Sequence, residues 1–230
     1  MKLKAVLFDL GGTLIEMLDV SEILQKLLEA KGILRSIEEI SKAVEVANKH
    51  MGGYKDLPNL REEFWIKWNT EILKTLGTQR DQKILSAYIF ESWWDYAQVR
   101  LYPEVRKVLQ RLREKGLKLG VVTNALKSDA DKLLPQFGLT NAFDIVVVID
   151  SVGKMKPDKD MFLQALKKLN VKPHEALFIG DRIEEDYNGA KNTGINALLI
   201  DRENKIEGNV DKIQSLKEIF EKLDIQQETI

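Results

Sequence analysis

Short apolar runs recur along the chain and alternate with segments in which apolar residues return every three or four positions. The runs are nearly continuous in hydrophobic residues, as expected for strands that are covered on both faces. They are Lys4–Leu10, Leu117–Thr123, Phe143–Asp150, Ala176–Asp181 and Ala197–Asp201. We therefore predict five buried strands of a parallel sheet.

Helical patterns separate the later runs. Two of them place their apolar residues on one helical face: Val105, Val108, Leu109 and Leu112, then Phe162, Ala165, Leu166 and Leu169. The first pattern is bounded by Pro103 and Gly116, which are typical of helix starts and ends. Strands that alternate with helices indicate an α/β fold, with helices on both faces of the parallel sheet.

The stretch from residue 16 to residue 98 has a different pattern, with amphipathic helices and no convincing strand. Ser36 and Glu39 have the spacing of a capping box at the start of a helix. Apolar residues at helical spacing occur in three further places: Val20 to Leu28, Phe64 to Leu76, and Ile84 to Trp94. We expect a helical domain of residues 16–98 inserted into an α/β domain of residues 1–15 and 99–230.

Composition excludes several classes of function. The 230 residues include 35 basic and 36 acidic ones, a net charge of −1, so no basic footprint for nucleic acid or anionic lipid is present. The chain has no cysteine, which excludes disulfides and thiolate metal sites. Its apolar start is short and interrupted by Asp9, which favours the first strand of a cytoplasmic protein over a signal peptide.

Polar residues follow the predicted strands at the edge where open α/β sheets bind their ligands. Asp9, in FDLGGTL, stands beside two glycines that let backbone N–H groups approach an anion. Thr123 and Asn124, in GVVTNA, offer a hydroxyl and backbone donors to a phosphoryl oxygen. A turn-forming aspartate and an ordinary polar loop are the simpler explanations of each segment taken alone.

Two later segments carry charge. Lys156, in GKMKPD, would neutralise an anionic substrate, and Lys154 is a competing candidate that stands further from Pro157. The segment GDRIEED holds four carboxylates, which repel one another unless a cation lies among them: Asp181, Glu184, Glu185 and Asp186. Mg²⁺ prefers such oxygen ligands. A surface lysine and an acidic helix start remain the alternatives.

In this order, the four segments resemble the four motifs of the haloacid dehalogenase-like hydrolase superfamily. FDLGGTL resembles its nucleophile loop, VVTNA its hydroxyl motif, GKMKPDKDMF its lysine motif and IGDRIEEDYNGA its acidic motif. The resemblance implies a Rossmann-like parallel sheet and a small all-helical cap domain inserted after the nucleophile loop. It also implies Mg²⁺-dependent hydrolysis of phosphate monoesters, with a small phosphorylated metabolite as substrate. We expect the protein to be a monomer or a homodimer.

Residue by residue, the resemblance assigns a role to each strand end. Asp9 would form a phosphoaspartyl intermediate, while Thr123 and Lys156 would act in catalysis and bind the phosphoryl group together with Asn124. The implied Mg²⁺ ligands are the carboxylates of Asp9, Asp181 and Asp186 and the carbonyl of Gly11.

Gly11 departs from the family's phosphatases, which usually carry a second aspartate there to protonate the leaving group. General acid–base assistance typically raises the rate about 10²–10⁴-fold. The absence of this aspartate therefore keeps two alternatives open, a nearly inactive binding module and a 2-haloacid dehalogenase. Glu16 and His50 are candidate replacement acids. The tryptophans of residues 65–94 fit a helical core better than an aromatic substrate pocket.

Overall fold

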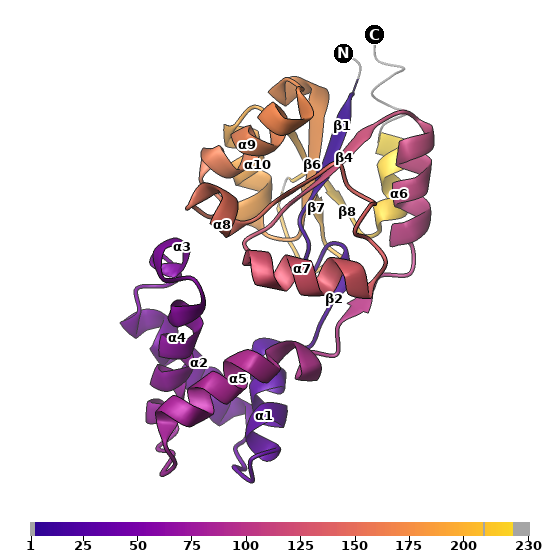
Figure 1. Cartoon of the computed structure of the whole chain (residues 1–230). Coiled ribbons are helices and arrows are strands. Elements are labelled where there is room, and N and C mark those ends of the chain that lie inside the picture. Colours follow the sequence, from indigo (N-terminus) through magenta and orange to yellow (C-terminus); the bar gives the residue numbers. More distant parts are fainter. Residues whose placement is uncertain (1–2, 209, 223–230) are drawn as a thin grey trace. The chain divides into compact units, whose positions relative to one another are not determined.

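A computed structural model describes residues 3–208 and 210–222 of the chain. The chain divides into two compact units, one made of Met1–Glu16 with Leu101–Ile230 and the other of Met17–Arg100. The first unit is built on a sheet and the second on helices (Figure 1). Within the described residues, every helix is too short or too polar to cross a membrane.

Within the part of the chain that the structure describes, the main sheet has six parallel strands. In chain order they are β1 (Ala5–Phe8), β4 (Lys118–Val122), β5 (Ile145–Val147), β6 (Ala176–Gly180), β7 (Asn196–Ile200) and β8 (Lys212–Ile213). Their order across the sheet is β5-β4-β1-β6-β7-β8, and each pair of neighbours runs parallel. Each of the five predicted apolar runs holds one strand, which confirms the parallel sheet. The two-residue β8 was not predicted.

The strand order places β1 at the centre of this sheet. The chain builds β4 and β5 on one side of β1 and then crosses over to build β6, β7 and β8 on the other. Such a reversal opens a crevice at the carboxyl ends of the central strands, where ligands of open α/β sheets bind. Asp9, Thr123 and Asp181 each follow one of these strands directly.

Helices cover both faces of the sheet, as predicted. They are α6 (Val105–Glu114), α7 (Lys127–Gln136), α8 (Ile149–Val152), α9 (Lys159–Leu169) and α10 (Gly189–Asn192). Two short 3₁₀ helices, η1 (Pro173–Glu175) and η3 (Leu216–Glu218), and a π-helix, η2 (Ile183–Asn188), are also present. Helices α9 and α10 lie on one face and α6 on the other (Figure 1). The α/β fold class is therefore confirmed.

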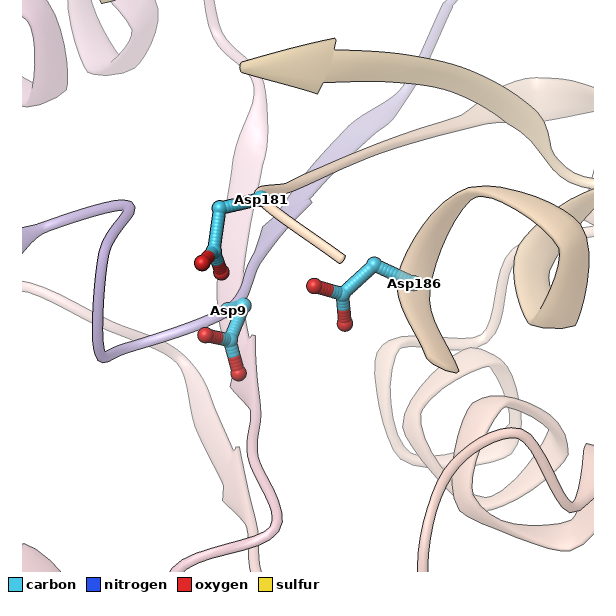
Figure 2. A group of neighbouring side chains, drawn as sticks. All are labelled: Asp9, Asp181 and Asp186. Carbon is cyan, nitrogen blue, oxygen red and sulfur yellow. The ribbon is translucent and has the colours of Figure 1, made fainter. Parts of the chain in front are cut away.

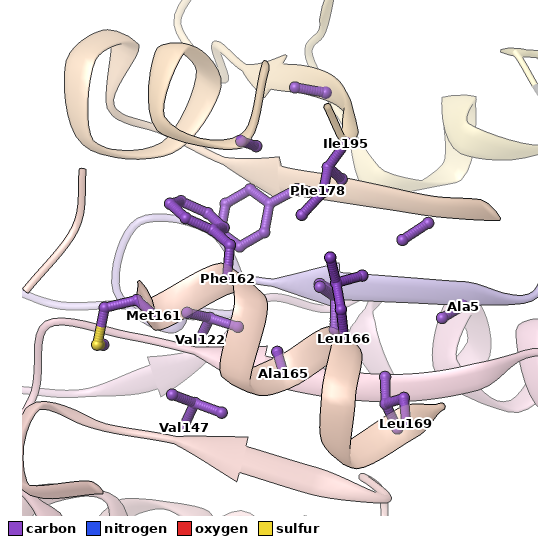
Figure 3. Close-up of a cluster of buried hydrophobic side chains, with 14 residues drawn as sticks. Ala5, Val122, Val147, Met161, Phe162, Ala165, Leu166, Leu169, Phe178 and Ile195 are labelled. Carbon is purple, nitrogen blue, oxygen red and sulfur yellow. The ribbon is translucent and has the colours of Figure 1, made fainter. Parts of the chain in front are cut away.

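A continuous apolar layer joins α9 to the sheet (Figure 3). Phe162 of α9 is fully buried, and its ring meets that of Phe178 in β6 edge-on, with 5.1 Å between the ring centroids. Ala5 and Leu7 of β1 face the same layer because alternate residues of a strand share one face. Removal of this apolar surface from water is the main force that holds α9 on the sheet.

The second unit is a helical bundle of α1 (Val20–Glu29), α2 (Ile37–His50), α3 (Leu57–Leu60), α4 (Glu62–Thr75) and α5 (Gln82–Tyr96). The predicted capping box forms: Ser36 N–H donates to Glu39 Oε2 at 2.8 Å, and Glu39 N–H donates to Ser36 Oγ at 3.2 Å. Trp68 is buried and donates to Asn48 Oδ1 at 2.8 Å, as a core tryptophan should. Two short strands pair where the chain passes between the units, β2 (Ile15–Glu16) and β3 (Arg100–Leu101).

Candidate active site

The ends of β1 and β4 bring polar groups to one edge of the sheet. Asp9 follows β1, and its N–H donates to the Ile179 carbonyl of β6 at 2.8 Å. Thr123 follows β4, and its N–H donates to the Val147 carbonyl of β5 at 3.0 Å. The ladder hydrogen bonds thus continue one residue past the strands and fix the backbone from which both side chains extend.

Lys156 forms the positive centre of this edge. Its Nζ lies 2.5 Å from Asp9 Oδ1 and 2.6 Å from Asp186 Oδ1, with 2% of its side chain exposed. The ammonium also lies 5.3 Å from the centroid of the Phe178 ring, which belongs to the apolar layer below. The competing Lys154 is at the surface, where it pairs with Asp158 and Asp160.

The carboxylates of Asp9, Asp181 and Asp186 face one another (Figure 2). Each offers an oxygen, and these oxygens all lie within 4.8 Å of one another. Asp186 Oδ2 also accepts the Arg182 N–H at 3.0 Å. Glu184 lies outside this group, since its side chain is exposed and accepts a hydrogen bond from Asn188.

Two glycines allow the carboxylates to come so close. A Cβ at Gly12 would lie 2.5 Å from Asp181 Oδ2, and the φ of Gly12 is +72°. A Cβ at Gly180 would lie 2.3 Å from Asp186 Cγ. Any larger residue at either position would push a carboxylate out of the group. Gly11 is different, because a Cβ there would meet no atom within 4 Å.

The crowding of negative charge shows in the pKa values. Burial raises the pKa of Asp9 to about 7; the Lys156 ammonium opposes this, and the charges of Asp186 and Asp181 add to it. Burial, and then the Asp186 charge, raise the pKa of Asp181 to about 6. Burial lowers the pKa of Lys156, but Asp9 and Asp186 outweigh it and hold the pKa above its usual value. One ammonium therefore does not balance these three carboxylates, and a cation among them would.

Thr123 and Asn124 have different surroundings. Thr123 is buried, and its Oγ1 accepts the Ala125 N–H at 3.3 Å, which leaves the hydroxyl hydrogen free to serve as a donor. The Asn124 carboxamide pairs with the backbone of Lys156: Lys156 N–H donates to Oδ1 at 2.7 Å, and Nδ2 donates to the Lys156 carbonyl at 3.1 Å. Asn124 thus fixes the segment that carries the lysine, and its predicted contact with substrate stays a prediction.

Sequence reasoning missed a group that borders this edge. Arg202, two residues past β7, donates to backbone carbonyls of the loop after Asp9 and pairs with Glu104. No motif marks either residue. The residue types were the only signal in the sequence that these two residues could pair, because a buried glutamate requires a cationic or hydrogen-bonding partner. His50, a candidate acid, lies at the end of α2 in the helical unit, where its Nδ1 is 3.6 Å from Glu71 Oε2.

Comparison with known proteins places the chain in a family. A family model described as haloacid dehalogenase-like hydrolase matches residues 3–194. A glyceraldehyde 3-phosphate phosphatase of Methanopyrus kandleri is 30% identical over 206 residues, covering 87% of this chain and 84% of the relative. A phosphoglycolate phosphatase of Aquifex aeolicus is 30% identical over 198 residues, covering 86% and 84%.

A solved structure agrees with these relatives. The crystal structure of a phosphatase of the same family from Thermococcus onnurineus superposes with a TM-score of 0.62 at 28% identity, covering 96% of this chain and 98% of that one. The family match spans most of the strands of the sheet and all three carboxylates. The chain therefore belongs to the haloacid dehalogenase-like hydrolase family, and the prediction of an enzyme of this family is confirmed.

Proposed function

We propose that this enzyme hydrolyses phosphate monoesters of small metabolites through a phosphoaspartyl intermediate on Asp9, with Mg²⁺ as cofactor. The observation that carries the proposal is the position of the Asp9 carboxylate, which contacts Lys156 and faces Asp181 and Asp186. A nucleophile, a fixed cation and a group of oxygen ligands are the parts that phosphoryl transfer requires. The names of the relatives as phosphatases support the same reaction.

The donor set fits Mg²⁺, which prefers oxygen ligands and commonly pairs one or two carboxylates with a substrate phosphate. Asp9 and Asp181 are the direct ligands that we favour, with the Gly11 carbonyl beside them. Asp186 already directs one oxygen to Lys156 and the other to the Arg182 N–H, so it holds the lysine as well as completing the site. When bound, Mg²⁺ would balance the carboxylates and withdraw charge from the phosphoryl oxygens.

The chain's own groups divide the reaction between them. A carboxylate oxygen of Asp9 attacks phosphorus, an O–P bond forms, and the bond to the leaving oxygen breaks. Lys156 neutralises charge on the phosphoryl oxygens, and the Thr123 hydroxyl donates to one of them. Water then attacks phosphorus, releases inorganic phosphate and restores the Asp9 carboxylate. With glycine at position 11, the leaving oxygen takes its proton from solvent or from another side chain.

Two observations bear on the substrate class, and they favour different substrates. The relatives' names specify glyceraldehyde 3-phosphate and phosphoglycolate, both alkyl phosphates with strongly basic leaving groups. Gly11 instead favours leaving groups that need little protonation, such as acyl, anomeric or aryl phosphates. We infer a small phosphorylated metabolite, and a series of substrates with graded leaving groups separates the two possibilities.

Phosphate release by the wild type and by Asp9→Asn tests the proposal, with each of these substrates in Mg²⁺ and in EDTA. We expect release that requires Mg²⁺ and that falls by about 10⁴-fold or more in Asp9→Asn, because an amide is not a nucleophile. Glu184→Gln is the matched control, since it removes a carboxylate of the same segment outside the group, and it should keep wild-type rates. Turnover of a halogenated acid in EDTA would establish dehalogenation instead.

A further inference from the structure

The side chain of Arg202 holds the loop after Asp9 from outside. Arg202 Nη2 donates to the Thr13 carbonyl at 2.7 Å, and its Nε donates to the Gly12 carbonyl at 3.3 Å. On the other side, Nη1 donates to Glu104 Oε1 at 2.8 Å. The guanidinium carbon lies 3.3 Å from the centroid of the Tyr102 ring. Arg202 therefore ties two consecutive carbonyls of the loop to a buried carboxylate.

Two adjacent glycines give this loop little conformational preference of its own, so its hydrogen bonds determine its shape. The Gly12 N–H donates to the Ile15 carbonyl at 2.8 Å. In a trans peptide the carbonyl points opposite to the N–H, so this bond directs the Gly11 carbonyl away from Ile15. The next peptide, between Gly12 and Thr13, has its carbonyl bound by Arg202. Both peptides that flank Gly12 are thereby oriented.

Glu104 in turn orients Arg202. Only 8% of the Glu104 side chain and 18% of the Arg202 side chain are exposed. Burial raises the pKa of Glu104, but hydrogen bonds, first that of Arg202 and also one with the Leu216 backbone, outweigh it and lower the pKa. The segment that carries Glu104 is joined to the same loop, since Tyr102 N–H donates to the Leu14 carbonyl at 3.1 Å. A guanidinium with a fixed carboxylate behind it presents its remaining donors in one plane.

We propose that Arg202, held by Glu104, is a positioning residue of the active site. It acts through the Gly12 and Thr13 carbonyls to fix the loop, and so fixes the direction of the Gly11 carbonyl, the backbone ligand of the proposed metal site. The inference rests on the proposed function, since it assigns the loop a role in Mg²⁺ binding. In this role Arg202 acts on the backbone of the loop and not on the metal or the substrate.

Magnesium binding without substrate tests this role. The double variant Arg202→Met/Glu104→Gln removes the guanidinium and leaves no unpaired buried charge. Loss of an outer group that orients a ligand typically weakens metal binding about 10–100-fold. We expect the Mg²⁺ concentration that gives half of the rise in unfolding temperature to increase about tenfold or more, with phosphate release recovering at high Mg²⁺.

Arg113→Met is the matched control. Arg113 also joins a carboxylate to a backbone carbonyl, those of Asp144 and Ala142, but it lies away from the loop. This variant should lower the unfolding temperature in EDTA and leave the Mg²⁺ midpoint unchanged. Arg202→Lys is a second probe that keeps the charge beside Glu104, and its single ammonium should give an intermediate rise in the midpoint.

The positioning role would be overturned if the double variant and Arg202→Lys were less stable in EDTA but kept the wild-type Mg²⁺ midpoint. They would show that Arg202 serves stability alone. A wild type whose unfolding temperature does not respond to Mg²⁺ would instead contradict the metal in the proposed function, and the inference with it. The two failures are distinguishable because only the second involves the unaltered protein.

Discussion

Strand β1 contributes to two buried regions that differ in almost every physical respect. Ala5 and Leu7 belong to the apolar layer beneath α9, whereas Asp9, just past the strand's end, belongs to the charged group at the edge of the sheet. Water is largely excluded from both regions, although 29% of the Asp181 side chain remains exposed. In the apolar layer this exclusion is the source of stability, while at the edge it disfavours ionised carboxylates and raises their pKa values.

The two regions meet at Phe178, whose ring packs on that of Phe162 and also lies near the Lys156 ammonium. The lysine that serves the site thus borders the apolar layer. The Phe178 ring therefore separates the stabilising apolar layer from the charged group. Substitution in the apolar layer should therefore lower the stability of the fold, whereas substitution in the charged group should raise it.

The largest effect on stability is expected in the apolar layer. Phe162→Ala should reduce the free energy of unfolding by about 3–5 kcal/mol, because it removes a fully buried ring and leaves a cavity. Urea unfolding followed by circular dichroism measures this loss. Leu163→Ala, one residue along α9 and 41% exposed, should have a much smaller effect. Equal losses in the two variants would contradict the assignment of this layer as the stabilising region.

A substitution at the charged edge should act in the opposite direction. The pKa of Asp181 is raised to about 6 from 3.8, so the folded metal-free protein binds more protons than the unfolded chain between these values. Its stability therefore decreases as pH rises through this window. Asp181→Asn should be more stable than the wild type in EDTA at pH 8, by about 1–3 kcal/mol, and this difference should vanish below pH 4.

Asp144→Asn supplies a control of opposite sign. Burial raises the pKa of Asp144, but the Arg113 guanidinium and the Leu119 N–H outweigh it and lower the pKa. Its contribution to stability is present at neutral pH and is lost as pH falls through the folded pKa. The unfolding temperatures of both variants, measured between pH 3 and 8, test these two pH dependences. If Asp181→Asn were less stable than the wild type in EDTA at pH 8, the edge would not be under electrostatic strain.

The same contrast explains how much of the molecule could be predicted from sequence. The apolar layer leaves a regular pattern, and the runs that hold β1 and β6 and the helical repeat of α9 were predicted from it. The charged edge was predicted because Asp9 and Asp181 stand at the ends of such runs, and because the four segments resemble motifs of one family. Position along a strand was sufficient to bring Asp9 and Asp181 together.

What the sequence did not reveal depends on contacts without a local pattern. The Arg202–Glu104 pair joins residues 98 positions apart, and no spacing rule connects them. Asn124 is of a residue type that commonly binds substrates, yet its carboxamide pairs with the backbone of Lys156. Only the fold brings these two residues together. Strand β8 has two residues, which is too short for any periodicity to show.

The smallest expected effect concerns catalysis at Gly11. The structure leaves room for the aspartate that the family's phosphatases usually carry, since a Cβ at Gly11 would meet no atom within 4 Å and its φ lies outside the left-handed region. Gly11→Asp should raise turnover on alkyl phosphates about tenfold or more, toward the range of general acid catalysis. Aryl phosphates, whose leaving groups need little protonation, should gain far less.

Gly12→Asp makes the same chemical change one residue later and is the sharpest control for this prediction. There the new Cβ would overlap the Asp181 carboxylate and adopt a φ of +72°, so activity should be lost on every substrate. A rise confined to alkyl phosphates in Gly11→Asp, set against loss in Gly12→Asp, would show that the wild type lacks an acid at this position. If Gly11→Asp changes no rate while still binding Mg²⁺, another group already protonates the leaving oxygen, and the same leaving-group series applied to Glu16→Gln and His50→Gln would identify it.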